Sequence, residues 1–467
     1  MDTTKLIFFL FAAIVCGVGA ALSKNQRRYF LLLLVLFAPL SSAIIFYKLN
    51  GIMLMDFPLI VLLILGFSSN KKFSFYISKV SLPALGIVVW GLISAFNATD
   101  TGLAISEWTR VLRAYLTFLC IVNYTKTRAD IQTVVGGLFA GLAFQSLLGV
   151  YQWRYGPLGL TFLEEIGYSW RSAGTFIHPA MFGDYLILLL PLVFRLFMFY
   201  KQQEKIYVRF YGVLFFLGIG ALLGSYARGP WICFGGSIII MFIFSIHRKR
   251  FQPKMKGILA LLVLFFIIFI LHYGSTIKEQ FVDENRQGSA HVRIPLNKVA
   301  MRIIKDHSFL GTGLGNYTLL TPQYAHLEAT REHSYRDLLQ HVHNSYLLIA
   351  AETGIPGLLC FIGFIISLFR YGIKVVRSKN AYISNLGIGI LTGCFAVLIA
   401  FLAGPDYRCH QILIMFWLIG GFIVALGRLR IRIPQPKIPR QSMEGMNVDT
   451  GEELTQLKQE KKTLYPI

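Results

Sequence analysis

The stretch AMFGDYLILLLPLVFRLFMFY, residues 180–200, decides the fold class, because its apolar run is long enough to cross a membrane. A helix rises about 1.5 Å per residue, so roughly 20 residues span the ~30 Å of hydrocarbon in a bilayer. Inside lipid the backbone finds no water to bond, which leaves the α-helix as the structure of an isolated span. The stretch therefore predicts a transmembrane helix.

Similar apolar runs recur along the whole 467-residue chain, of which 55% is hydrophobic. We expect an all-α, polytopic transmembrane helical bundle with 12 or 13 spans. The thirteen candidates are 5–22, 29–46, 52–68, 80–96, 108–123, 132–153, 180–200, 207–224, 229–246, 257–273, 344–369, 382–403 and 410–427. The first lacks the basic flank of a cleaved signal peptide, so it is expected to be retained. If one early run is a hairpin or lies in the interface, the count is twelve and both chain ends lie inside.

The formal net charge of +22 is concentrated in short loops between the apolar runs. With alternating spans, the basic loops all fall on one side, which the positive-inside tendency makes cytoplasmic. These loops are 24–28, 69–79, 126–128, 201–209, 247–256 and 370–379, followed by the tail from residue 428. The charge therefore orients the chain among membrane lipids and indicates no nucleic-acid partner.

Two domains are expected, a transmembrane domain at 1–433 and a cytoplasmic tail at 434–467. The tail holds Pro, Gln, Glu and Lys with few large apolar residues, a composition typical of disorder. The transmembrane domain carries one large outer loop, 274–343. Apolar side chains recur at helical spacing near 296–305, which predicts an amphipathic helix resting on the membrane or on the bundle.

The segment HVHNSYL, residues 341–347, places histidines where this polar loop enters a span. Imidazole has an ordinary pKa near ~6.5, so His343 is a candidate general base that accepts a proton from a sugar hydroxyl. The alternative is a capping or interfacial histidine that bonds the backbone. His341, Asn344 and Tyr346 beside it are candidate substrate-binding residues.

Four arginines lie on the outer side of the predicted bundle, where a charge is costly unless it faces a cavity. They are Arg110, Arg113, Arg228 and Arg293. The planar guanidinium suits a diphosphate, so all four are candidate substrate-binding residues. The alternative is that they snorkel to the interface or pair with an acidic neighbour, as Arg110 can with Glu107.

Two outer aspartates have competing interpretations. Asp184 either faces a cavity or is a helix N-terminal carboxylate favoured by the helix dipole, and we favour the second. Asp406 either orients His343 or an arginine, or pairs with Arg408.

Metal and nucleotide sites fail on spacing, and no cofactor is expected. His326, His333, His341 and His343 crowd one loop without an HExxH pattern or a fourth ligand at a recognised interval. Residues 311–316, GTGLGN, follow no strand and precede no GK[ST], so they predict a turn that uses the conformational freedom of glycine. The six cysteines form no CxxC pair or cluster and are expected to be small core residues.

Several segments together resemble the O-antigen ligase and polymerase superfamily, in their residues, order and spacing. They are SYARGPW at 225–231, Arg293, IKDHSFLGTGLGNY at 304–317, HVHNSYL at 341–347 and ETGIPGL at 352–358. The motifs cover roughly residues 170–370. The resemblance implies a GT-C-like membrane glycosyltransferase that takes a glycan from undecaprenyl diphosphate and transfers it with inversion and without a metal.

The resemblance also implies roles for three residues. The essential arginines of the superfamily fall on Arg228 and Arg293, and its essential histidine falls on His343. Guanidinium groups would stabilise charge growing on the leaving diphosphate, while the imidazole takes the acceptor's proton from the opposite face. Ala227 and Ser308 depart from the usual pattern, the second standing where proline is frequent.

An O-antigen ligase of the bacterial inner membrane is the expected function, with lipid A-core as the acceptor and a site that faces the periplasm. The donor motifs fit an O-antigen polymerase or a protein O-oligosaccharyltransferase equally. A transporter of lipid-linked oligosaccharides is the alternative from another class, because buried arginines also suit a translocation path. The paired repeats that many transporters show are not evident in the sequence.

Overall fold

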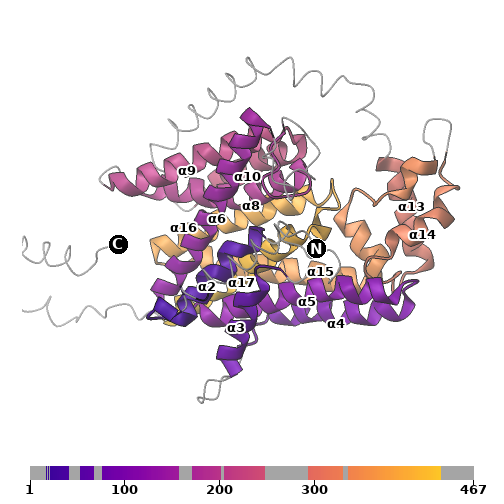
Figure 1. Ribbon diagram of the computed structural model, residues 1–467, viewed down its shortest axis with the longest axis horizontal. Coiled ribbons are helices and arrows are strands. Elements are labelled where there is room, and N and C mark those ends of the chain that lie inside the picture. The colour runs from indigo at the N-terminus through magenta and orange to yellow at the C-terminus, as the bar shows by residue number, and fades with distance from the viewer. Residues whose placement is uncertain are drawn as a thin grey trace, which may run out of the picture. The chain divides into compact units, whose positions relative to one another are not determined.

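The computed structural model describes residues 17, 19, 21–40, 53–67, 76–156, 171–200, 204–247, 293–329 and 335–432, which form helices joined by turns (Figure 1). Within these ranges 7 helices are long and apolar enough to cross a membrane. They are α6 (Arg128–Tyr155), α8 (Pro179–Phe199), α9 (Lys205–Gly224), α10 (Arg228–His247), α15 (Ser345–Val376), α16 (Ala381–Ala400) and α17 (His410–Arg432). The predicted all-α membrane bundle is confirmed.

Four further helices match predicted spans: α2 (Gln26–Phe37), α3 (Asp56–Phe67), α4 (Ser81–Ser94) and α5 (Thr101–Tyr124). The predicted span 257–273 and most of 5–22 lie outside the described residues, so the count of 12 or 13 stays a prediction. The chain divides into a compact unit, Met1–Arg430, and a second unit, Ile431–Ile467. The predicted tail at 434–467 lies outside the described residues.

The middle of the bundle is built from α8, α16 and α17, whose side chains are buried nearly all round. A helix that is apolar on every side belongs in such a position. Gly389 and Gly393 let α16 approach the backbone of α8 at Leu192 and Leu188, where an added Cβ would collide. By contrast, α9, α10 and α15 leave apolar side chains exposed on one side, as lipid-facing helices do. Four of the five cysteines in the described ranges are buried, as core residues would be.

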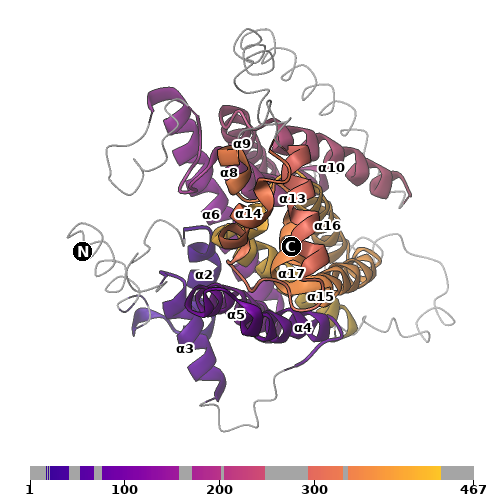
Figure 2. The same ribbon diagram turned by 90° about the vertical axis from the view of Figure 1, so that its right-hand side faces the viewer.

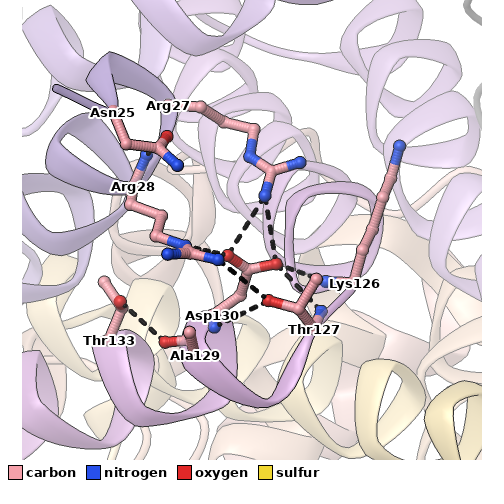
Figure 3. Close-up of polar contacts among 8 residues, drawn as sticks. All are labelled: Asn25, Arg27, Arg28, Lys126, Thr127, Ala129, Asp130 and Thr133. Atoms are coloured by element: carbon pink, nitrogen blue, oxygen red, sulfur yellow. Dashed lines mark hydrogen bonds and ion pairs between the residues drawn. The ribbon is translucent and has the colours of Figure 1, made fainter. Parts of the chain in front are cut away.

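One buried carboxylate joins two of the predicted basic loops (Figure 3). Asp130 pairs with Arg27 at 3.1 Å and Arg28 at 2.8 Å, and it accepts backbone N–H groups from Lys126 and Thr127 at 3.0 and 2.9 Å. Asp130 and Thr127 also form a capping box that begins α6. Loops 24–28 and 126–128 therefore lie together at one end of the bundle.

Other basic segments lie at this same end. The charge of Arg128 is close enough to interact with Tyr200, next to loop 201–209, and with Tyr382, at the start of α16. Arg428 stacks over the ring of Tyr76, 4.2 Å from its centroid. These contacts agree with the predicted grouping of basic loops on one side.

The structure corrects the start of one predicted span, because α5 begins at Thr101 and not near residue 108. Asp100 caps this helix by accepting the N–H of Leu103 at 2.9 Å. Glu107 and Arg110, expected in or beside a loop, are therefore helical and share one face with Arg113 at three-residue spacing.

Residues 293–329, part of the predicted outer loop, form a helical cap at the end of the bundle opposite the basic loops, which we call the outer end. The predicted amphipathic helix is confirmed as α13 (Arg293–Asp306), which buries Leu296, Val299, Ala300 and Ile303 and exposes Lys298, Arg302 and Lys305. Its apolar face packs on the protein, against α14 (Tyr317–Ala325) and α15. Figure 1 shows α13 and α14 beyond the end of the bundle, and Figure 2 looks onto that end.

Candidate active site

At its outer end, α8 begins with His178 as the N-cap residue. Nδ1 of His178 accepts the N–H of Ala180 at 3.1 Å, and Pro179 follows as the first helical residue. Burial lowers the pKa of His178, and the nearby Arg171 and His343 lower it further. Residues of three different segments therefore meet at this helix end.

The segment that carries His343 is fixed where α15 begins. Asn344 caps α15 by accepting the N–H groups of Tyr346 and Leu347 at 2.9 and 3.1 Å. Ser345 donates its N–H to the carbonyl of Phe401 at 2.8 Å and its hydroxyl to the carbonyl of Gly404 at 2.8 Å. The capping role considered for His343 therefore belongs to its neighbour, Asn344.

His343 is half-buried beside Arg293, the first residue of α13. Burial, and then the charge of Arg293, lower the pKa of His343 below its ordinary value of about 6.5. A neutral imidazole at neutral pH is the form that accepts a proton.

A buried pair of carboxyl groups lies within electrostatic range of Arg293. The Asp184 and Asp406 side chains hydrogen-bond each other, which requires a proton between them, because two carboxylates repel. Burial raises the pKa of Asp406 to about 6, although the bond to Asp184 and the charge of Arg293 each lower this pKa. Both side chains are almost fully buried.

These contacts correct one prediction and bear on another. The favoured helix-terminal interpretation of Asp184 is wrong, because α8 starts at Pro179 and leaves Asp184 beyond the first turn. Asp406 lies near Arg293, as the arginine-orienting interpretation requires. The ion pairs of Arg408 go to Glu107 and Glu352 and not to Asp406.

The turn before Arg228 is strained and tightly held. Tyr226 has φ 51°, the one positive φ of a non-glycine residue in the described ranges. Arg171 donates Nε to the carbonyl of Ser225 at 3.1 Å and Nη2 to that of Tyr226 at 3.3 Å. Strain of this kind persists only where the surroundings enforce it, and it is concentrated at functional sites.

This turn packs on α8 beside the carboxyl pair. A Cβ added to Gly183 would collide with Pro230 and contact Ala227, on either side of Arg228. Gly183 precedes Asp184, so the beginnings of α8 and α10 lie against each other. The structure thus gathers the turn of Arg228, the helix start at Arg293 and the loop of His343 around the outer end of α8.

A second charged group adjoins His341. Arg408 Nη1 lies 3.3 Å from Glu352 Oε1 and 3.4 Å from each ring nitrogen of His341. Its Nη2 lies 3.7 Å from Glu107 Oε1. Burial and the charge of Arg408 lower the pKa of His341 to about 4, so this ring is neutral.

Tyr346 donates its hydroxyl to the carbonyl of Leu398 at 2.8 Å.

Arg110 and Arg113, both on α5, are engaged in ion pairs. Arg110 lies 2.8 Å from Glu107, as the pairing alternative predicted, and Arg113 lies 2.7 Å from Asp56. The pairing alternative therefore describes both side chains, and their binding of substrate stays a prediction.

The glycine-rich segment 311–316 is a turn, as predicted. Gly311, Gly313 and Gly315 have φ of 72°, 84° and 80°. The turn packs on a break in α15 at Gly354, where the Thr312 N–H donates to the carbonyl of Ala351 at 2.9 Å. The motif therefore fixes the cap to the bundle.

The roles of Arg171 and Arg408 were missed from the sequence. Both sit in connections between predicted spans, where no repeating pattern applies, and their partners are distant in the chain. A usable signal was Glu352, a carboxylate inside an apolar run, because such a group demands a cationic partner.

One family model matches part of this chain. Residues 213–362 match the family described as O-Antigen ligase, and this range contains Arg228, Arg293, His341 and His343. No curated protein shows significant similarity to the chain. Residues 213–362 are therefore similar to the O-antigen ligase and polymerase family, whose members are membrane enzymes that transfer glycans.

Proposed function

We propose that this protein is an O-antigen ligase, which transfers O-antigen polysaccharide from undecaprenyl diphosphate to lipid A-core. The transfer inverts the anomeric centre, needs no metal and takes place on the periplasmic face of the bacterial inner membrane. The observation that carries the proposal is that Arg293 lies within electrostatic range of His343 near the outer end of α8, inside the range that matches the family.

Arg228 and Arg293 bind the donor diphosphate. As the bond to the anomeric carbon breaks, negative charge grows on the leaving oxygen, and fixed guanidinium groups stabilise it more than the ground state. The strained turn at Tyr226 and the carboxyl pair of Asp184 and Asp406 support this role, because they restrain the two arginine-bearing segments.

His343 is the general base for the acceptor. Its lowered pKa keeps the ring neutral, and the acceptor hydroxyl gives its proton to the ring as its oxygen attacks. Attack on the face opposite the diphosphate inverts the configuration. Binding both sugars in line supplies the proximity that such a displacement needs.

The test is transfer by purified protein from a defined undecaprenyl diphosphate glycan. Three acceptors are compared: lipid A-core, a second lipid-linked glycan and an acceptor peptide, each with and without a chelator. Glycosylated lipid A-core of inverted anomeric configuration, formed equally with chelator, is the expected product. Elongated lipid-linked glycan indicates a polymerase, modified peptide an oligosaccharyltransferase, and glycan movement without a new bond a transporter.

A further inference from the structure

The short turn η4 (Asp406–Arg408) between α16 and α17 sends its two charged side chains to different neighbours. Asp406 contacts Asp184, and the charge of Arg293 acts on it. Arg408 reaches Glu107 on α5, Glu352 on α15 and His341 in the loop before α15. Asp406 therefore belongs to the donor side of the candidate site, whereas Arg408 has no role in the proposed chemistry.

Arg408 is held from two sides by acids. Its side chain is 21% exposed, and those of Glu107 and Glu352 are 14% and 6% exposed. Glu352 also accepts the backbone N–H groups of Gly315 and Tyr317, which fixes this carboxylate to the glycine turn. An arginine can contact several partners at once, because its guanidinium carries five donors in a rigid fork. The guanidinium therefore has little freedom to leave His341.

The contact between Arg408 and His341 affects His343, because only one residue separates the two histidines. Val342 between them is fully buried, and the far end of the segment is fixed by Asn344 and Ser345 at the start of α15. With both ends held, the backbone at His343 is restrained to one path. An imidazole that accepts a proton must be aligned with the hydroxyl within a few tenths of an ångström, so this restraint matters for the reaction.

We propose that Arg408 is a positioning residue: Glu107 and Glu352 hold its guanidinium, which in turn holds His341 and so orients the loop that presents His343. The inference rests on the proposed function, because it takes His343 as the base. It predicts that Arg408 affects the chemical step and leaves donor binding unchanged, since its contacts go to His341 and the two glutamates.

The activity test compares Arg408→Gln, Arg408→Lys, His341→Ala and the double variant His341→Ala/Arg408→Gln in the transfer assay. Arg302→Gln is the matched control, because Arg302 pairs with Glu328 at 2.6 Å on the outer face of α13, away from the loop. We expect Arg408→Gln to lower kcat roughly 10- to 100-fold with the donor KM changed less than about twofold. The double variant should be no slower than His341→Ala, and the control should match the wild type.

Arg408→Lys keeps a cation between the two glutamates and guards against a fold defect in the glutamine variant. Lysine lacks the fork that reaches His341 and the acids together, so this variant should keep the wild-type Tm and still lose most of kcat. Normal kcat in either Arg408 variant would overturn the proposal. Additive losses in the double variant would equally overturn it, because the effect would not pass through His341.

Hydrogen exchange gives a readout that does not depend on the reaction. Peptides covering 341–347 should exchange faster in both Arg408 variants than in the wild type, and no faster in Arg302→Gln. If the wild type makes no product with any acceptor, the proposed function fails, while exchange in the loop still decides the positioning role. Unchanged exchange in both variants would refute that role.

Discussion

Asp184 of α8 and Asp406 of η4 share a hydrogen bond between their carboxyl groups, next to Arg293. The bond needs one proton, so the pair carries about one negative charge, which faces one guanidinium. The charge of the pair therefore acts on Arg293 without neutralising both of the arginines that the proposed donor site needs.

Replacing Asp406 with asparagine should preserve the fold and impair transfer. The amide keeps a hydrogen bond to Asp184 but removes the charge beside Arg293, so donor affinity should change first. We expect Asp406→Asn to lower kcat/KM for the donor by roughly tenfold or more, as loss of a charge-assisted contact would. Steady-state transfer assays check this, with Asp306→Asn, at the exposed last residue of α13, as the control. Equal rates for Asp406→Asn and the wild type would contradict the account.

His343 should stay neutral to lower pH than an ordinary histidine. Burial and Arg293 both lower its pKa, so the neutral fraction persists as the pH falls below about 6.5. Arg293→Gln removes one of these causes, and the midpoint should move to higher pH. The rate of carbethoxylation at His343, followed by mass spectrometry against pH, measures this. A midpoint above about 6.5 in the wild type, or no change in the variant, would show that the predicted environment is wrong.

Arg171 should matter for transfer although it is not itself a proposed catalytic group. Arg171→Ala removes the donors that satisfy the carbonyls of Ser225 and Tyr226, so the turn before Arg228 loses its restraint. We expect transfer to fall roughly tenfold or more, as displaced catalytic groups would cause. Arg154→Ala, at an exposed arginine on the outer end of α6, is the control and should be active. Comparable activity of the two variants would exclude this role.

The contact of α16 with α8 should tolerate no added side chain. A Cβ at Gly393 would collide with the backbone of Leu188, whereas one at Gly236 of α10 would meet nothing within 4 Å. Overpacking costs about 1–3 kcal/mol, so Gly393→Ala should lower the midpoint of thermal unfolding in detergent by several degrees. Gly236→Ala should unfold as the wild type does. Equal stability of the two variants would show that α16 and α8 do not pack backbone against backbone at this point.

The parts of this architecture that depend on local periodicity could be predicted from the sequence. The apolar run at 180–200 predicted α8, and the helical spacing of apolar residues near 296–305 predicted α13. The glycines at 311, 313 and 315 predicted a turn. Each of these signals lies within one short window, where hydropathy and backbone freedom act directly.

The pairing of side chains could not be predicted in this way. Asp184 looked like a helix-terminal carboxylate because its partner, Asp406, lies far along the chain and only helix packing brings them together. Arg408 looked like a partner for its near neighbour Asp406, yet it pairs with Glu107 and Glu352. The arrangement of the helices in space decides which charged side chains pair. Sequence periodicity carries no information about that arrangement.

The central claim is that His343 takes the acceptor's proton while arginines hold the donor diphosphate. Its most direct test is single-turnover transfer by purified His343→Ala protein with saturating undecaprenyl diphosphate glycan and lipid A-core. Loss of a general base costs roughly 10²- to 10⁴-fold in rate, so we predict a fall of that size with donor binding retained. Transfer by His343→Ala at the wild-type rate would contradict the account.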